Sequence, residues 1–148
     1  MTEAKESDYL YLDRREDFEE LHKLLSKKIE EDGDEPIGSF DLAKADELDS
    51  LLNISKQKFF GIEAYPTLAE KAAILFYSIN KQQIFLNGNK RMSTLSLLVF
   101  LAMNGKLLSV TPDELTAKAL WLATTESKEF QSIKKELTEW INKSMTNF

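Results

Sequence analysis

A polar turn runs directly into a strongly apolar helical segment near the middle of this chain, and this junction constrains the fold more than any other feature. The turn spans residues 82–91, and the apolar segment spans 92–103. A turn at the start of a helix leaves backbone N–H groups without partners. The adjacent Asn89, Lys90 and Arg91 add donors and positive charge. The sequence therefore predicts a phosphate or other anion site here.

Charge along the chain supports an anion site. Residues 1–35 hold 13 acidic and 6 basic residues, whereas residues 36–148 hold 12 acidic and 13 basic residues. Residues 71–112 contain no Asp or Glu, so no nearby part of the sequence supplies a carboxylate as a base or hard-metal ligand. An acidic chain without clustered Lys and Arg is a poor candidate for binding nucleic acid.

Length and composition predict a single domain over residues 1–148. The chain has no cysteine, which fits a reducing cytoplasm, and its acidic start lacks the basic and apolar regions of a secretion signal. The longest apolar run covers residues 95–103. A bilayer span requires many more consecutive apolar positions than this run supplies. We therefore expect a cytoplasmic protein without a membrane span.

Helical spacing of apolar residues and capping patterns predict six helices. They are expected at about 14–31, 44–57, 68–81, 89–103, 112–124 and 130–141. Capping boxes are predicted at Asp13, with Glu16 as its reciprocal residue, and at Thr67. Thr111 is predicted to be an N-cap that is followed by a proline and acids in the first turn. The fourth helix is apolar on every face, which predicts that it is buried nearly all round. His22, on the first helix, is expected to be an ordinary, partly exposed side chain.

One aromatic connector, residues 59–66, interrupts the helices and has the composition of a short β-hairpin. The remainder of the pattern is helical. The sequence therefore predicts an all-α fold, a helical bundle with a central buried helix and one short hairpin connector.

The turn also resembles the active-site loop of the Fic/Doc family, whose pattern is His-x-Phe-x-(Asp/Glu/Asn)-(Gly/Ala)-Asn-(Gly/Lys)-Arg. The matching residues are Phe85, Asn87, Gly88, Asn89, Lys90 and Arg91, and the histidine position holds Gln83. The resemblance extends from roughly residue 54 to residue 124. It implies the Fic fold, in which the active-site loop joins two central helices and a flap docks the target. The aromatic connector would supply that flap through Phe60, Ile62 and Tyr65, although such aromatics are as often core residues.

The resemblance also implies a role for each loop position. The family's histidine deprotonates the target hydroxyl, which the neutral amide of Gln83 cannot do. Phe85 would anchor the loop in the core. Asn87 stands where the family often has an acid that binds Mg²⁺, so metal binding should be weak.

The end of the loop completes the implied site. Gly88 and Asn89 would form an anion nest, with Arg91 as the charge partner of a phosphate. Lys90 is the residue of the Doc branch, which transfers phosphate to a translation elongation factor, whereas AMP-transferring members usually have Gly here. Thr94 replaces the later arginine of the AMP-transferring pattern, and no family-type inhibitory glutamate motif is present.

These residues leave three functional interpretations open. The first is a Doc-like enzyme that binds ATP or another nucleotide and moves a phosphoryl or AMP group to a hydroxyl of a target protein, such as a translation factor, with activity weakened or lost through Gln83. The second is an inactive domain that senses nucleotides or partners an antitoxin. The third is that Gln83 was introduced to make a toxic protein producible.

Overall fold

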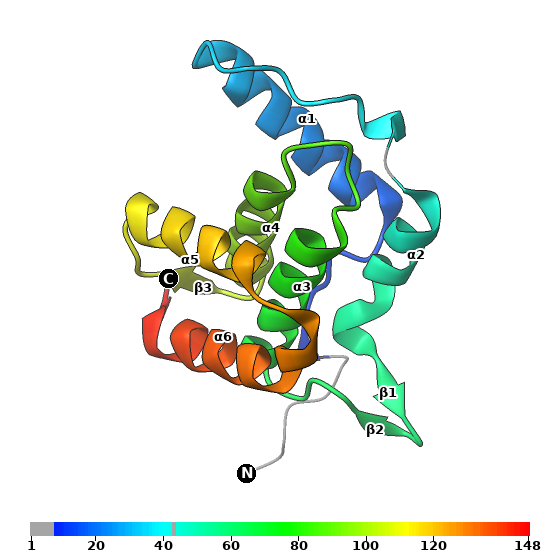
Figure 1. Ribbon diagram of the computed structural model, residues 1–148. Coiled ribbons are helices and arrows are strands. Elements are labelled where there is room, and N and C mark those ends of the chain that lie inside the picture. The colour runs from blue at the N-terminus through cyan, green and yellow to red at the C-terminus, as the bar shows by residue number, and fades with distance from the viewer. Residues whose placement is uncertain (1–7, 43) are drawn as a thin grey trace.

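Two central helices, α3 (Leu68–Gln82) and α4 (Asn89–Met103), are joined by the turn that the sequence analysis singled out (Figure 1). The computed structural model describes residues 8–42 and 44–148. The other α-helices of this part are α1 (Arg15–Glu31), α2 (Ala45–Asn53), α5 (Pro112–Thr124) and α6 (Phe130–Ser144). Short 3₁₀ turns lie at η2 (Phe40–Leu42), η3 (Ile54–Lys56) and η4 (Ser127–Glu129). The predicted all-α fold class is confirmed.

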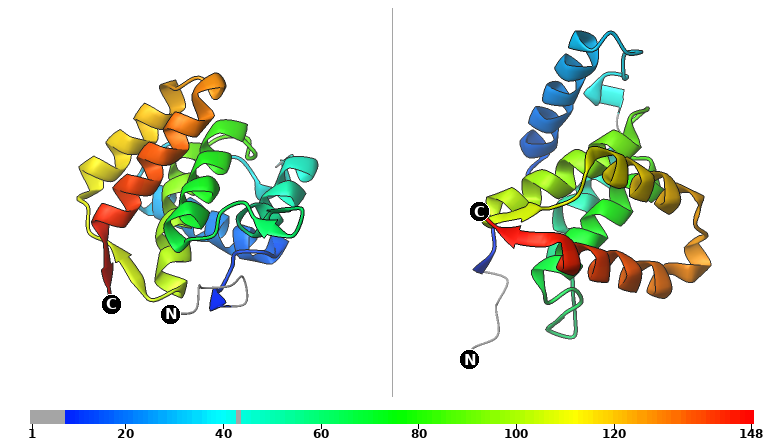
Figure 2. Two further views of the ribbon diagram at one scale, coloured as in Figure 1. Left: turned by 90° about the horizontal axis from the view of Figure 1, so that it is seen from below. Right: turned by 90° about the vertical axis from the view of Figure 1, so that its left-hand side faces the viewer.

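Helix α3 is the most deeply buried element, because other elements surround it. It contacts α4, α5 and α6 as well as α2 and η3. Helices α5 and α6 lie on one side of the α3–α4 pair, and α1 and α2 lie on another (Figure 2). The core-facing side chains of α3 include Phe76 and Ile79, both fully buried. The loop therefore starts from the most constrained helix of the molecule.

The prediction that α4 is buried nearly all round is wrong. Its buried face carries Met92, Leu97, Phe100 and Leu101, whereas Leu98 is 36% exposed. Helices α1, α3 and α5 contact α4 but leave one edge open. Apolar side chains occur singly on most protein surfaces, so a helix can be apolar on every face without being enclosed.

Of the three capping predictions, the one at Thr111 is confirmed. The one at Thr67 is confirmed for the cap but not for the reciprocal bond, because the Glu70 carboxylate accepts from the Thr67 hydroxyl at 3.0 Å instead of from the backbone N–H. The Thr67 hydroxyl accepts the backbone N–H of Glu70 at 3.1 Å, and Thr111 caps α5 in the same way. The predicted cap at Asp13 is wrong, because α1 starts one residue later. The Asp17 carboxylate accepts the backbone N–H of Arg14 at 3.1 Å, while Asp13 forms an ion pair with Lys56 at 2.5 Å.

Two short antiparallel strand pairs, of which only the first is a hairpin, complete the fold. The first pairs β1 (Lys58–Phe59) with β2 (Ile62–Glu63), in the predicted connector. The second pairs β3 (Lys106–Leu108) with β4 (Met145–Asn147) and returns the end of the chain to the end of α4. The second pair was not predicted, because strands this short have no detectable alternation of apolar and polar residues. Within the described residues, no helix is both long and apolar enough to cross a bilayer.

Candidate functional site

The loop between α3 and α4 begins at a residue with a left-handed backbone. Gln83 ends α3 with φ 49° and ψ 53°, and its side chain is exposed. The next two residues, Ile84 and Phe85, turn inward and are buried. The Phe85 ring packs 5.9 Å from the ring of Phe40, measured between centroids. The predicted anchoring of the loop by Phe85 is therefore confirmed.

The side chain of Asn89 ties the two ends of the loop together. Its Oδ1 accepts the backbone N–H of Phe85 at 3.0 Å, and its Nδ2 donates to the carbonyl of Phe85, also at 3.0 Å. This amide was predicted to bind a phosphate. In the structure both polar atoms bind the main chain, so Asn89 shapes the loop, and only the second N–H of its Nδ2 is left for an anion beside the neighbouring main-chain donors.

Those neighbours are the first backbone N–H groups of α4. Gly88 precedes the helix with φ 75°, and no side chain in residues 8–42 or 44–148 caps it. The first intrahelical bond runs from the N–H of Met92 to the carbonyl of Gly88, at 2.8 Å. The N–H groups of Asn89, Lys90 and Arg91 consequently have no acceptor in the helix, as is general at helix starts. Helix starts with this arrangement are suited to anions.

His22 is a buried part of the loop's support, and the expectation of a partly exposed side chain is wrong. It is only 5% exposed, and its ring lies 5.8 Å from that of Phe85 and 5.7 Å from that of Phe40. Burial lowers the pKa of His22, and a hydrogen bond with the backbone of Gly38 opposes that effect. The neutral ring is thus the favoured form.

A segment far from the loop in sequence, residues 34–39, lies across it. The N–H of Gly38 donates to Oδ1 of Asn87 at 2.6 Å. A Cβ placed on Gly88 would approach Cγ2 of Ile37 to 2.8 Å, and one on Gly38 would approach Cδ2 of Leu86 to 2.5 Å. The two segments can pack this closely only because Gly38 and Gly88, one on each segment, have no side chain. We call residues 34–39 the crossing segment.

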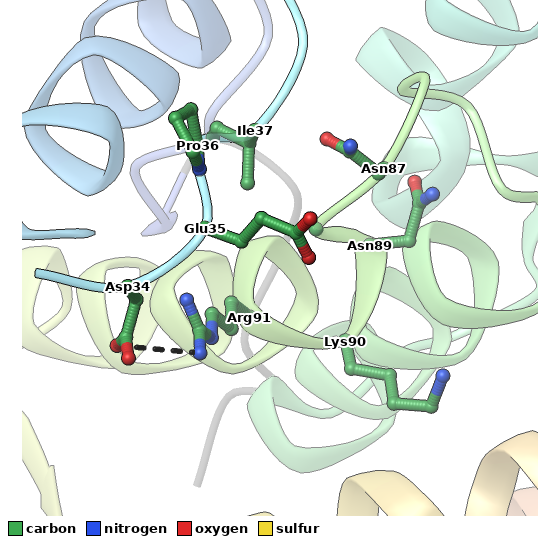
Figure 3. Close-up of a pocket in the computed structure, with 9 residues that line it drawn as sticks. Asp34, Glu35, Pro36, Ile37, Asn87, Asn89, Lys90 and Arg91 are labelled. Carbon is green, nitrogen blue, oxygen red and sulfur yellow. Dashed lines mark ion pairs between the residues drawn. The ribbon is translucent and has the colours of Figure 1, made fainter. Parts of the chain in front are cut away.

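Two pockets open on either side of the loop. The larger, of about 760 Å³, lies between the crossing segment and the start of α4 and is lined by residues 34–37 and 87–91 (Figure 3). The smaller, of about 300 Å³, is lined by Asn80, Lys81, Gln83, residues 86–90 and Ala123. Gln83, Asn87 and Lys90 therefore share one pocket.

Carboxylates reach this site despite their absence from the surrounding sequence, so the predicted lack of a local acid fails in three dimensions. Asp34 pairs with Arg91 at 3.6 Å, and Glu35 also lines the larger pocket. Figure 3 shows Glu35 directed into the space between the crossing segment and α4, whereas Lys90 points away from it. The crossing segment supplies acids that the loop itself lacks.

The residues expected to form the flap lie elsewhere. Phe60 and Ile62 are exposed on the β1–β2 hairpin, at the opposite end of α3 from the loop (Figure 1). The whole length of α3 separates them from it. Tyr65 is 8% exposed and packs beneath Lys134, whose Nζ lies 5.0 Å from the ring centroid. The structure does not bring these residues to the loop.

Metal-binding groups are sparse. Among the residues that the structure describes, no group of three or more His, Cys, Asp or Glu side chains could hold a metal ion. The oxygen of Asn87, the predicted weak ligand, already accepts the hydrogen bond from Gly38. Any cation at the loop would take most of its ligands from outside this chain.

Comparison with known proteins gives two matches. The model of the Fic/DOC family matches residues 11–101. A curated protein named Toxin Doc, from Mycolicibacterium smegmatis, is 30% identical over 100 residues, which cover 67% of this chain and 77% of that protein. No solved structure matches significantly.

Proposed function

This chain belongs to the Fic/DOC family, and on that premise we propose that its motif loop, residues 83–91, binds the phosphates of ATP or another nucleotide. The observation that carries the proposal is the start of α4. Three backbone N–H groups there have no helical acceptors. Lys90, whose side chain has no hydrogen bond or ion pair with the described residues, lines both pockets at this helix start. This combination of donors and unpaired charge suits a phosphate.

The reaction proposed for this site is transfer of a phosphoryl or AMP group to a hydroxyl of a target protein. The hydroxyl oxygen attacks a phosphorus atom, and the bond from that phosphorus to its bridging oxygen breaks. ADP leaves in phosphoryl transfer and pyrophosphate in AMP transfer. Lys90 favours the Doc-like phosphoryl reaction by resemblance.

The proton of the attacking hydroxyl has no acceptor on the loop in this chain. We take Gln83 to occupy the position of the family's histidine, and an amide does not accept that proton. Loss of a general base lowers a rate by about 10²–10⁴-fold, so the proton would pass to water in a slow reaction supported by positioning alone.

Mg²⁺ fits this site only in part. The neutral oxygen of Asn87 has a second lone pair beside the one that accepts from Gly38. It can therefore add one ligand to a cation held mainly by phosphate oxygens and water. A bound Mg²⁺ would neutralise phosphate charge. Asn87 would orient it weakly.

A second candidate function is a binding module without activity, and Gln83 is the observation that favours it. Because a relative carries the name Toxin Doc, we propose in either case that the chain acts as a Fic-like toxin paired with an antitoxin. The two candidates differ in chemistry at position 83.

The deciding experiment is a transfer assay with Gln83→His. The variant and the original protein are incubated with a bacterial lysate and ATP labelled in the α or γ phosphate. Transfer should rise by at least about tenfold, the lower part of what a general base supplies. Gln82→His, one residue earlier and also exposed, is the matched control and should leave transfer unchanged.

Equal and appreciable transfer by the original protein and Gln83→His would show that the base lies elsewhere. No transfer by either, in samples that bind ATP, would favour the binding module.

A further inference from the structure

We propose that Lys81 allows the smaller pocket to accept phosphate, because its charge balances the negative ends of two helices that meet there. The inference rests on the proposed binding of phosphate at the motif loop and assigns a positioning residue to that site. It follows from the directions in which three helices reach the pocket.

Three helix termini meet at the smaller pocket. Helix α3 ends there with Asn80 and Lys81, α5 reaches it with its penultimate residue, Ala123, and α4 starts there with Asn89 and Lys90. The C-terminal end of a helix carries about half a negative charge, and the N-terminal end carries about half a positive one. Two of the three termini therefore disfavour a phosphate.

Lys81 lies at both of the negative ends. It belongs to the last turn of α3, and its Nζ donates to the carbonyls of Leu122 and Thr125 at the end of α5. Helix α5 has no basic residue in its own last turn, so α3 supplies the cation there. The two ends together carry about one negative charge, which the single charge of the ammonium balances.

This balance leaves the start of α4 as the effective helix charge at the pocket, and that charge is positive. Lys90, which also lines the pocket, adds a full positive charge. No Asp or Glu is among the described residues that line it. Without Lys81, a phosphate at the loop would face two helix ends whose carbonyls repel it. With Lys81 in place, the field of the pocket favours an anion.

The contacts to the phosphate come from α4, and Lys81 acts mainly through its charge. Two of the three N–H groups of its ammonium are used by the carbonyls at the end of α5, and its side chain is half-buried. Its effect on a phosphate is therefore the removal of a repulsion. Another cation at the end of α5 should have the same effect.

The test is a calorimetric titration of ATP into the original protein, Lys81→Gln and Lys81→Arg. Gln keeps a donor for the α5 carbonyls but has no charge. Lys81→Gln should weaken ATP binding by at least about threefold, in the range of a charge at a helix terminus, and Lys81→Arg should leave it nearly unchanged. Lys134→Gln is the matched control, because Lys134 is also half-buried and pairs with Glu70 at 3.6 Å, in the first turn of α3 and far from the loop.

Two further measurements separate charge from packing. The loss in Lys81→Gln should shrink as the ionic strength rises from about 0.01 M to about 0.1 M, because the Debye length falls from about 30 Å to about 10 Å. Thr124→Lys, at an exposed position in the last turn of α5, should restore ATP binding to Lys81→Gln by returning a cation to that helix end. A loss that does not change with salt, or that Thr124→Lys does not restore, would contradict the inference.

ATP binding by the original protein separates this inference from the proposed function. If the original protein and Lys81→Gln bind ATP equally well, the inference is wrong and the function stands. If Lys81→Gln does not fold, Thr124→Glu decides, because it adds a negative charge to the same helix end. Binding that is at least about threefold weaker in Thr124→Glu supports the inference, and unchanged binding contradicts it. An original protein that binds no ATP removes the proposed function itself.

Discussion

The side-chain amide of Asn89 and the main chain of Phe85 form a closed pair of hydrogen bonds, both 3.0 Å long, across the motif loop. The pair joins the buried anchor of the loop to the first residue of α4. The geometry of the N–H groups at the helix start thus depends on a side chain that need not touch a phosphate. An Asn at this position is a structural requirement of the loop.

Asn89→Asp should test this requirement. The carboxylate cannot donate to the carbonyl of Phe85, and two oxygen atoms would face each other there. We expect a loss of about 1–2 kcal/mol in the free energy of unfolding, the usual cost of a broken hydrogen bond that leaves a group unpaired. Urea denaturation measures it. The same change at the exposed Asn53 should cost less than about 0.5 kcal/mol, and equal losses would refute the role of the pair.

Gly88→Ala should be more destabilising than Gly61→Ala. Both glycines have a left-handed backbone, with φ of 75° and 79°. Both substitutions therefore carry a conformational cost of about 1–2 kcal/mol. Only at Gly88 would the new Cβ clash, at 2.8 Å from Cγ2 of Ile37, whereas at Gly61 no atom of the described residues lies within 4 Å of it.

The difference should disappear in an Ile37→Ala background, because the clashing methyl group is then absent. Chemical denaturation of the glycine variants and their parents gives the comparison. A Gly88→Ala cost that stays the same with and without Ile37 would show that the crossing segment moves aside freely.

Acid should destabilise the fold through His22. Burial lowers its pKa in the folded protein below the ordinary value of 6.5, so the unfolded chain binds the proton more tightly. The stabilisation is complete above about pH 6.5 and is lost as the pH falls toward the folded pKa, with a slope of at most about 1.4 kcal/mol per pH unit.

His22 is the only histidine in the chain, which makes the effect assignable. Unfolding of the original protein and of His22→Gln is compared between pH 7.5 and 5. The free-energy difference between the two should shrink as the pH falls. A constant difference would mean that the ring can be protonated in place.

Asn87→Asp should increase the contribution of Mg²⁺ to nucleotide affinity without loosening the crossing segment. A carboxylate can still accept the N–H of Gly38 and offers a second, charged oxygen to the cation. ATP titrations with and without Mg²⁺ should show a Mg²⁺ effect at least about threefold larger in the variant. Asn87→Leu, which removes the side-chain oxygen, is the control. An unchanged Mg²⁺ effect in Asn87→Asp would show that residue 87 is not a ligand of the metal.

Local signals in the sequence were sufficient to predict where the helices and the motif loop lie. Thr67 and Thr111 act through bonds to residues three positions away, and Phe85 follows the motif at a fixed offset, so the sequence alone identifies them. The crossing segment could not be found this way, because Gly38 and Asn87 are 49 positions apart. The same separation hid Glu35 from a search for acids near the loop.

Two other placements have a similar origin. His22 was expected to be partly exposed, which is wrong, because the covering ring of Phe40 comes from another element. The hairpin at Phe60 and Ile62 was expected by resemblance to dock the target, and α3 holds it at the end far from the loop (Figure 1). Contacts between distant segments determined each outcome.

The central claim is that the start of α4 binds phosphate with the help of Lys90. Calorimetric titration of ATP into the original protein and into Lys90→Ala tests it most directly, with Lys128→Ala as a control at an exposed lysine of η4. We predict saturable binding by the original protein, unchanged in Lys128→Ala and about tenfold weaker in Lys90→Ala, as expected for loss of a charge-assisted contact. No binding at millimolar ATP by a folded sample, or equal binding by Lys90→Ala, would contradict the account.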